Sequence, residues 1–390
     1  MLNILTITSL YPNAEQPVHG VFVENRLRHL VASSEVNLRV VAPVPWFPFS
    51  GKIFGQYGVY ANVPASETRH GISIIHPKFP IIPKIGMSLG PRLMYWALKP
   101  VLAKILADGA KYDLIDEHYF YPDGVAAAML GQAFDLPVVI TSRGTDINLI
   151  PQYETPRRQI LWAADKAAGM ITVSAALKRR LIELGAAEAK IEMLRNGVDL
   201  QTFNMMERTK CRSRFNIQGP TLLSVGNLVP LKGHDLVIRA LENLPGFQLI
   251  IAGDGPERAR LESLVDDLEL KNRVQFLGRI AHEELPGLYS AGDALVLASS
   301  REAWPNVLLE SMACGTPAIA TNVGGVSEIV TKPASGLVVE DRTPEALAAA
   351  ARQLFDNLPD RAATRAYAEG FSWDATTQGQ LDLFHSIMEA

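Results

Sequence analysis

The chain has 390 residues, of which 48 % are hydrophobic and 20 % charged, and its formal net charge is −4. This length exceeds one ordinary hydrophobic core, and the nearly balanced charge argues against nucleic acid as a partner. The two cysteines, Cys211 and Cys314, lie far apart, so neither a disulfide framework nor a cysteine metal site is expected. The first apolar run, 2–8, lacks a basic start and a cleavage site, which indicates a strand and predicts a cytoplasmic protein.

Short apolar runs alternate with longer amphipathic segments throughout the first half of the chain. Helices are predicted over 21–33, 91–108, 123–133, 156–167 and 175–184. Strands are predicted over 2–8, 38–43, 72–77, 113–119, 137–142 and 170–174. Runs this short, rich in Val and Ile and separated by helices, indicate a parallel sheet that is covered on both faces.

The same alternation restarts after the polar segment 204–220. Strands are predicted over 221–226, 247–252, 274–278, 294–298, 317–321 and 336–339. The repeat predicts an α/β protein of two doubly wound domains, over 1–203 and 204–370, and a final amphipathic helix within 371–390 that packs back on the first domain. Because open sheets bind ligands at the carboxyl ends of their strands, residues at those ends are the candidates for function.

A lysine follows the first strand of the second half, just before a predicted helix. Gly226 ends the strand and Lys232 lies near the end of the loop, where an ammonium group can reach a phosphate as a point charge. An exposed loop lysine without a ligand is the alternative interpretation.

The next two strands lead into glycine-containing turns. Gly253 and Gly255 begin a dinucleotide fingerprint, but Arg258 stands at the position of its third glycine. A tight turn with Pro256 at the start of a helix is the better interpretation. After the following strand, Arg279 can approach a phosphate while the extended backbone binds a base edge, and a purely structural turn is the alternative.

Two glutamates lie on either side of a helix start predicted at Pro305. A helix start leaves N–H groups unpaired and carries partial positive charge, so the amides of residues 306–308 can bind a phosphate. Glu310, further into the helix, can accept two hydrogen bonds from a ribose diol, as an acid does in dinucleotide domains. Glu302, in the loop before the helix, would then lie at the sugar end of the same ligand. Either glutamate alone is more often a surface residue, and the combination with Lys232 favours a ligand site.

These motifs together resemble a known family. The spacing of Glu302 and Glu310, with the segment GNLVPLKG (226–233), is similar to retaining family 4 glycosyltransferases (glycosyl transferases group 1) of the GT-B fold. NGVD (196–199) resembles the end of their first domain, and FSW (371–373) resembles the start of their C-terminal crossover helix. The resemblance covers nearly the whole chain. It implies two Rossmann-like doubly wound parallel-sheet domains that face each other across a cleft.

The resemblance implies a donor site in the second domain, with Glu302 and Lys232 as catalytic residues there and His118 as a catalytic residue from the first domain. Glu310 would bind the ribose, Lys232 the pyrophosphate, and Glu302 the sugar hydroxyls near the reacting centre. His118 matches the histidine that these enzymes place against the donor sugar, and a satisfied core histidine is the alternative. The other donor-binding positions are Gly226, Asn227, Arg279, Ile280, Asn306, Val307 and Leu308.

One departure from the family pattern affects the anion site. Many relatives have arginine where this chain has Asn227, which leaves Lys232 and Arg279 to carry the charge of the pyrophosphate. No Asp-x-Asp triplet occurs, so ligand spacing implies no metal, and we expect neither a metal nor another cofactor. The resemblance implies retention by attack on the same face, with the leaving phosphate taking the proton of the acceptor.

The acceptor is expected to contact the first domain, where Gly20, Arg143 and Asp146 are candidates. Segments 42–52 and 77–106 mix aromatic, apolar and basic residues, which is compatible with a membrane that holds a lipid-linked sugar. Their aromatic and basic residues include Trp46, Phe47, Lys78, Lys84, Arg92, Tyr95, Trp96, Lys99 and Lys104. A core helix and two ordinary loops are the preferred interpretation, because the stems of Lys and Arg cover apolar surface in any case.

The sequence therefore predicts a retaining, metal-independent glycosyltransferase that uses a nucleotide-diphosphate sugar, with a UDP-sugar favoured over a GDP-sugar. Its acceptor would be a glycan or lipid-linked sugar of surface polysaccharide or glycolipid synthesis, and the protein could lie peripherally on the cytoplasmic face of the membrane. Another GT-B enzyme, such as a sugar-nucleotide epimerase, is one alternative. A non-catalytic partner subunit is the other, and the intact set of Glu302, Glu310, Lys232 and His118 argues against it.

Overall fold

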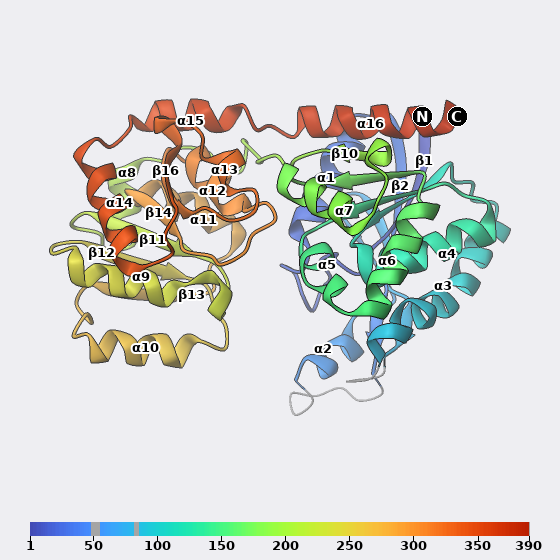
Figure 1. Ribbon diagram of the computed structural model, residues 1–390, viewed down its shortest axis with the longest axis horizontal. Coiled ribbons are helices and arrows are strands. Elements are labelled where there is room, and N and C mark those ends of the chain that lie inside the picture. The colour runs from blue at the N-terminus through green and yellow to red at the C-terminus, as the bar shows by residue number, and fades with distance from the viewer. Residues whose placement is uncertain (48–54, 82–85, 390) are drawn as a thin grey trace. The chain divides into compact units, whose positions relative to one another are not determined.

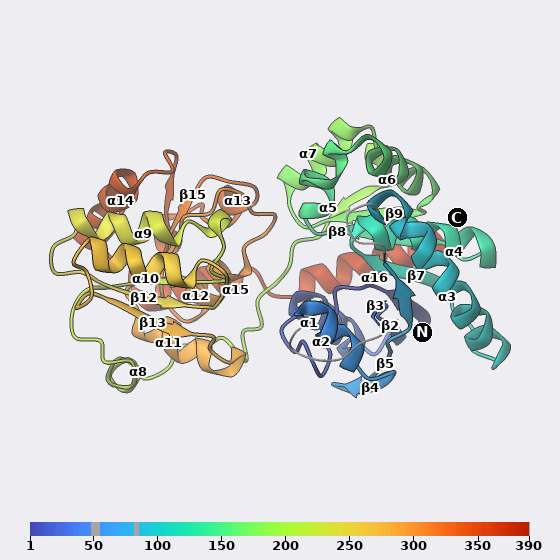
Figure 2. The same ribbon diagram turned by 90° about the horizontal axis from the view of Figure 1, so that it is seen from below.

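The computed structural model describes residues 1–47, 55–81 and 86–389, and the chain divides into two compact units (Figure 1). Unit 1 comprises Met1–Arg195 and Asp374–Ala390, and unit 2 comprises Asn196–Trp373. Each unit has its own β-sheet between helices, which is the predicted α/β architecture (Figure 2). Within the described ranges, no helix is both long and apolar enough to cross a membrane.

Unit 1 is built on an eight-stranded sheet in the order β10-β9-β8-β7-β1-β2-β5-β4, parallel except for the pair β4 and β5. The strand order reverses between β1 and β7, which is where open sheets bind ligands. Two further strands, β3 and β6, form a separate pair. The strands are β1 (Leu2–Ile7), β2 (Val36–Val41), β3 (Val44–Trp46), β4 (Ser66–Arg69), β5 (Ile72–Ile75), β6 (Lys78–Pro80), β7 (Leu114–His118), β8 (Val138–Ser142), β9 (Gly169–Thr172) and β10 (Ile191–Met193).

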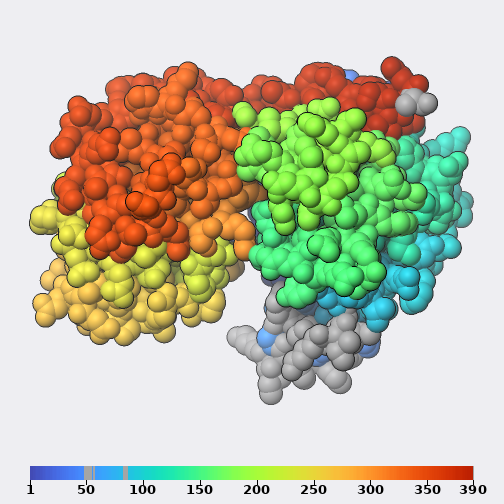
Figure 3. All heavy atoms as spheres, viewed as in Figure 1, coloured from blue at the N-terminus to red at the C-terminus, as the bar shows by residue number. Residues whose placement is uncertain are grey.

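Two helices from opposite ends of the chain cover one face of the unit 1 sheet, namely α1 (Val21–Ala32) and α16 (Asp374–Glu389). Leu27 of α1 and Phe384 of α16 are buried in one core with Ile4 of β1. The apolar residues of α1 recur at intervals of three and four, which gives the helix one buried face. In Figure 3, the red atoms that belong to α16 lie against the green atoms of unit 1.

The helices α3 (Gly90–Ala107), α4 (Val125–Phe134) and α6 (Glu154–Lys166) form a second layer of unit 1. α4 carries no charged residue and packs on β7 and β8, while α3 and α6 pack on α4. The remaining helices of unit 1 are α2 (Gln56–Asn62), α5 (Thr145–Asn148) and α7 (Ala175–Leu184).

Unit 2 is built on a six-stranded parallel sheet in the order β13-β12-β11-β14-β15-β16. Counted from β11, this is the 3-2-1-4-5-6 order of dinucleotide-binding domains, with the reversal between β11 and β14. The strands are β11 (Thr221–Val225), β12 (Gln248–Ala252), β13 (Val274–Gly278), β14 (Ala294–Leu297), β15 (Ala318–Thr321) and β16 (Gly336–Val339). The helices are α8 (Arg208–Arg214), α9 (His234–Ala240), α10 (Arg258–Asp267), α11 (Leu285–Ala291), α12 (Asn306–Ala313), α13 (Val326–Ile329), α14 (Pro344–Asp356) and α15 (Arg361–Glu369).

Every predicted strand corresponds to a strand of the structure, and the long predicted helices correspond to α1, α3, α4, α6, α7 and α16. The elements that were not predicted, such as β3, β4, β6, β10, α2, α5 and α8, are too short to show a hydrophobic period. The unit boundary precedes the expected position at 203. Val198 N–H donates to Phe371 O at 2.9 Å, and the Arg365 guanidinium donates to Phe203 O at 2.6 Å, so the segment 196–203 belongs to unit 2.

Candidate functional site

The residues predicted to bind the donor gather in unit 2, where the strand order reverses. The loops 226–233 and 298–305 follow the neighbouring parallel strands β11 and β14, so both leave the same edge of the sheet. Gly226 directly follows the last residue of β11, which ends one position before the predicted strand end, and the Lys232 side chain lies beside this glycine. Ser300 N–H donates to Leu231 O at 2.8 Å, which joins the two loops directly.

Lys232 and Glu302 form an ion pair between these two loops. Lys232 Nζ lies 2.6 Å from Glu302 Oε1, and the same oxygen accepts a 2.7 Å hydrogen bond from Ser299 Oγ. The side chains are 23 % and 11 % exposed, so both can be reached from solvent. The sequence predicted a phosphate contact for Lys232 and a sugar contact for Glu302, and the structure brings the two groups together as partners.

Close backbone contacts hold both loops in place. Gly233 has φ 67, and a β-carbon there would overlap the Ala298 carbonyl oxygen. Gly324 has φ 55, and a β-carbon there would overlap the Glu302 carbonyl oxygen. The buried Trp304 donates from Nε1 to Asn196 O at 2.9 Å. The cation and the acid are therefore mounted on loops whose positions are fixed before any ligand binds.

The helix α12 begins at Asn306, directly after Pro305, as the sequence predicts. In the described part of the chain, no side chain caps this helix start, and Leu308 N–H donates to Pro305 O at 3.1 Å. Asn196 Nδ2 donates to Asn306 Oδ1 at 3.5 Å. The amides of Asn306 and Val307 lie in the first turn, where the helix dipole gives them partial positive charge.

Glu310 lies in the second turn of α12 and is partly exposed. Its Oε2 accepts a 3.1 Å hydrogen bond from the hydroxyl group of the buried Tyr289. Burial raises the pKa of Glu310 to about 7, while the hydrogen bond from Tyr289 lowers it. A ligand that offers two hydroxyl donors would favour the ionised carboxylate, because hydrogen bonds to the charged form stabilise it.

The other predicted donor residues line the same sheet edge with different exposure. Asn227 and Arg279 are exposed, while Ile280 and Val307 are partly buried. The Leu308 side chain is fully buried, and its N–H donates to Pro305 O, so the structure engages both groups within unit 2. The Asn227 carbonyl accepts Val229 N–H at 2.9 Å and faces His234 Nε2 at 3.3 Å, which fixes the start of the loop.

In unit 1, His118 ends β7 and is completely buried. Arg143 Nη2 lies 2.5 Å from His118 Nδ1, and His118 Nε2 lies 3.1 Å from Asp116 Oδ2. Burial lowers the pKa of His118 to about 4, with Asp116 opposing that effect. In the neutral imidazole, Nδ1 accepts from the Arg143 guanidinium, and the ring proton is on Nε2, which lies close to the Asp116 carboxylate. His118 therefore stays uncharged near neutral pH and contacts partners within its own unit.

Three residues that sequence reasoning missed complete this polar cluster. Gln380 of α16 donates from Nε2 to Asp116 Oδ2 at 3.1 Å, and its Oε1 accepts from Arg26 Nε at 2.8 Å. All three side chains are buried. The available signal was the run LIDEH (114–118), in which three ionisable residues end a strand that should be apolar.

The predicted acceptor residues have structural contacts in unit 1. Asp146 is buried, and its carboxylate accepts the amides of Phe120, Arg143 and Gly144 at 2.6–3.1 Å, so it joins the loops after β7 and β8. Gly20 precedes α1 with φ 73 and packs against the backbone of Leu10. Their acceptor contacts stay predictions.

One lysine of the segments considered for membrane contact, Lys78, makes hydrogen bonds within unit 1. Lys78 Nζ donates to the carbonyl oxygens of Tyr60 and Val63 at 2.5 and 3.1 Å, so it stabilises β6 and the end of α2 and is not a free surface cation. Trp46 and Trp96 are exposed, as a surface role requires. Lys84 and residues 48–52 lie outside the described residues.

Comparison with known proteins identifies the family. Residues 206–371 match Glycosyl transferases group 1, and residues 26–202 match Glycosyltransferase Family 4. The D-inositol 3-phosphate glycosyltransferase of Kineococcus radiotolerans is 30 % identical over 318 residues, which cover 71 % of this chain and 72 % of that protein. The chain belongs to this glycosyltransferase family.

Two further glycosyltransferase comparisons concern one sequence relative and one solved structure. TuaC of Bacillus subtilis (strain 168), assigned to teichuronic acid biosynthesis, is 28 % identical over 358 residues, covering 90 % of this chain and 88 % of TuaC. The crystal structure of Anabaena Alr3699/HepE in complex with UDP has a TM-score of 0.75 at 21 % identity, covering 99 % of this chain and 100 % of that chain. This likeness shows the fold, and the glycosyltransferase has the GT-B architecture that the motifs implied.

The geometry of unit 2 shows what this glycosyltransferase can offer a ligand. A lysine, a helix start and two carboxylates lie along one sheet edge, which suits a ligand with an anionic centre and hydroxyl groups on both sides. In the described parts of the chain, no group of three or more His, Cys, Asp or Glu side chains is arranged to hold a metal ion.

Proposed function

We propose that this glycosyltransferase moves a sugar from a UDP-sugar to a glycan or lipid-linked acceptor, with retention of configuration and without a metal ion. A GDP-sugar is the second choice of donor. The observation that carries the proposal is the ion pair of Lys232 and Glu302 beside the start of α12, at the strand-order reversal of a dinucleotide-type sheet. The products would be cell-surface polysaccharides or glycolipids.

Departure of the nucleoside diphosphate leaves negative charge on its phosphate oxygens. The Lys232 ammonium group and the amides of Asn306 and Val307 would stabilise that charge, an electrostatic task that fixed donors perform well, while Leu308 N–H donates to Pro305 O. For this, Lys232 exchanges Glu302 for the phosphate, and Glu302 becomes free to accept hydrogen bonds from sugar hydroxyls. Because Asn227 is neutral, Arg279 is the second cation for the pyrophosphate.

Glu310 would bind the ribose of the donor. Its carboxylate lies one turn inside the helix whose start meets the phosphates, so one ligand can engage both. Two ribose hydroxyls that donate to Glu310 favour the ionised form over the protonated form. We therefore infer that donor binding releases a proton from Glu310 near neutral pH, since its pKa is raised to about 7.

Retention would follow from attack on the face that the phosphate leaves, with the phosphate oxygen taking the acceptor's proton. His118 stays neutral, because its pKa is lowered to about 4, so it would act through a hydrogen bond and not as a general acid. The role of His118 at the donor sugar, and those of Gly20, Arg143 and Asp146 at the acceptor, stay predictions.

The names of similar proteins support the donor and the product class. HepE has been crystallised with UDP and with UDP-glucose. TuaC is assigned to the biosynthesis of teichuronic acid. A lipid-linked or glycan acceptor of a surface polymer is compatible with these names, and a location at the cytoplasmic face of the membrane is part of the same proposal.

A thermal-shift series in EDTA tests the donor site. UDP is expected to raise the melting temperature of the native chain more than GDP or ADP, and Glu310→Ala is expected to remove the effect. Glu242→Ala is the matched control, because Glu242 is an exposed acid of unit 2 away from the site. Absence of any nucleotide effect would refute the donor site, and a requirement for Mg²⁺ would refute metal independence.

A product analysis tests the transfer itself. Incubation with UDP-sugars and candidate acceptors should give a glycosidic bond with the anomeric configuration of the donor, measured by the ¹H coupling constant of the anomeric proton. A product of inverted configuration would refute retention.

A further inference from the structure

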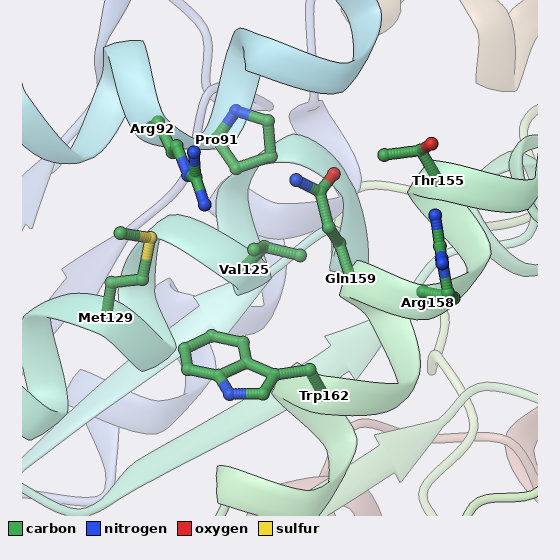
Figure 4. A pocket seen from close by; sticks show the side chains of 8 residues that line it. All are labelled: Pro91, Arg92, Val125, Met129, Thr155, Arg158, Gln159 and Trp162. Carbon is green, nitrogen blue, oxygen red and sulfur yellow. The ribbon is translucent and has the colours of Figure 1, made fainter.

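Unit 1 has a pocket that is lined by none of the predicted donor-binding residues and by none of Gly20, Arg143 and Asp146, while Arg92, named above for membrane contact, lies on its rim. It lies between α3 and α6, with α4 beneath, and has a volume of about 410 Å³ (Figure 4). Figure 4 shows that side chains of all three helices converge on it. The lining residues are Pro91, Arg92, Val125, Met129, Thr155, Arg158, Gln159 and Trp162.

The inner wall of the pocket is suited to hydrocarbon. Val125, Met129 and Trp162 supply an apolar surface. Gln159 is the amide on the wall, and its polar atoms are engaged inside the unit: Nε2 donates to Ser88 O at 3.0 Å, and Oε1 accepts from Tyr121 OH at 2.9 Å. An apolar pocket of this size binds the apolar part of a ligand and leaves polar recognition to its rim.

Two arginines supply that rim. Arg92 at the start of α3 and Arg158 on α6 line the pocket from opposite helices, and both are exposed. The acid near Arg158 is Glu154 at 3.9 Å, with both side chains about 70 % exposed (69 % and 74 %), so water screens this pair strongly. Guanidinium groups bind phosphate through paired hydrogen bonds, so the rim is suited to an anionic group.

The exposed face of α3 also carries basic and apolar side chains. Arg92, Trp96 and Lys99 follow at spacings of four and three, so they share one side of the helix. Trp96 is 64 % exposed, and residues 90–107 contain three basic residues and no acidic residue. Met87 and Leu89, just before the helix, are 47 % and 44 % exposed. A basic helix face with an exposed tryptophan is typical of helices that lie on anionic membrane surfaces.

We propose that the pocket binds a hydrocarbon chain of an anionic membrane lipid, with its phosphate between Arg92 and Arg158 and with the Trp96 face of α3 on the membrane surface. An apolar chain and a basic patch are the two signals that together give stable attachment to a membrane. The inference rests on the proposed function and deepens it, because it makes the acceptor a lipid-linked sugar presented at the bilayer. It also reverses the preference of the sequence analysis, which favoured a core helix over 91–108.

Co-sedimentation of the full chain with vesicles tests the binding. Vesicles of phosphatidylcholine with phosphatidylglycerol should bind the chain, and vesicles of phosphatidylcholine alone should not. The double variant Arg92→Gln/Arg158→Gln should bind roughly 30-fold more weakly, the effect of two basic residues at an anionic surface. Arg180→Gln is the matched control on α7 and should bind like the native chain. Equal binding to both vesicles, or an unchanged double variant, would overturn the proposal.

Quenching of Trp162 tests occupancy of the pocket. Phosphatidylglycerol with brominated acyl chains should quench part of the fluorescence, and Trp162→Phe should remove a component that Trp96→Phe leaves in place. Quenching that depends on Trp96 alone would place lipid on the surface only and would overturn the pocket assignment. A UDP thermal shift measured on each variant verifies folding. Vesicle binding with no UDP shift in the native chain would refute the donor site and leave the lipid site standing.

Discussion

Replacement of Glu310 by glutamine should stabilise the chain and abolish donor binding at the same time. The carboxyl group has its pKa raised from 4.5 to about 7 by burial, so the folded state holds a proton that the unfolded state releases. Stability from this group is fully present below about pH 4.5 and is lost as the pH rises through about 7. Glutamine has the same shape, keeps an oxygen for the Tyr289 hydroxyl and does not titrate.

The magnitude follows from the two pKa values. The pKa of Glu310 rises from 4.5 to about 7 on folding, and each unit of this difference corresponds to about 1.36 kcal/mol. Ionisation of the side chain therefore costs the folded state about 3 kcal/mol. The partly exposed side of Glu310 is screened by water, which reduces the cost to about 1–2 kcal/mol. The stability of Glu310→Gln relative to the native chain should therefore increase by about 1–2 kcal/mol as the pH rises from about 5 to about 8, or by about 2–8 °C in melting temperature.

The assay is a thermal melt of both proteins at several pH values between about 5 and 8. The melting temperature is read from the transition that UDP shifts in the native chain. The melting temperature of the variant should rise relative to the native chain as the pH increases, while its UDP shift is absent at every pH. Glu242→Gln, an exposed acid of the same unit, should run parallel to the native chain. A Glu310→Gln curve that also runs parallel would refute the assignment of Glu310 as a desolvated acid.

Three further perturbations test other parts of the structure. Lys232→Met should lower kcat by about 10²–10³-fold, because it removes the cation that stabilises the leaving phosphate. Steady-state kinetics would measure the loss, and an unchanged melting temperature would show that the variant is still folded. Gly233→Ala should lower both the melting temperature and the UDP affinity, because the added methyl group overlaps the backbone of the neighbouring loop. A native UDP affinity measured by calorimetry would contradict the expected loss of binding. Gln380→Leu should cost about 2–4 kcal/mol in denaturant melts, because it removes one hydrogen bond from each of the buried Arg26 and Asp116 side chains. The exposed Gln378→Leu on the same helix should cost less than about 0.5 kcal/mol.

Local features of the fold were readable from the chain alone. Buried parallel strands appear as short apolar runs. Gly226 follows the end of β11, and Pro305 precedes the start of α12. The acids at 302 and 310 could be assigned to a loop and a helix because their spacing from that proline is fixed by covalent geometry. Such signals depend on residues within one helical turn or one strand, where sequence distance and spatial distance agree.

The tertiary structure alone decided which of these residues meet. Lys232 and Glu302 are 70 positions apart, and Gln380 and Asp116 are 264 apart, yet each pair is in direct contact. No local pattern encodes such contacts, because they arise from the order of parallel strands and from the return of α16 to unit 1. The raised pKa of Glu310 and the lowered pKa of His118 have the same origin, since burial is a property of the packed sheet edge and not of the neighbouring sequence.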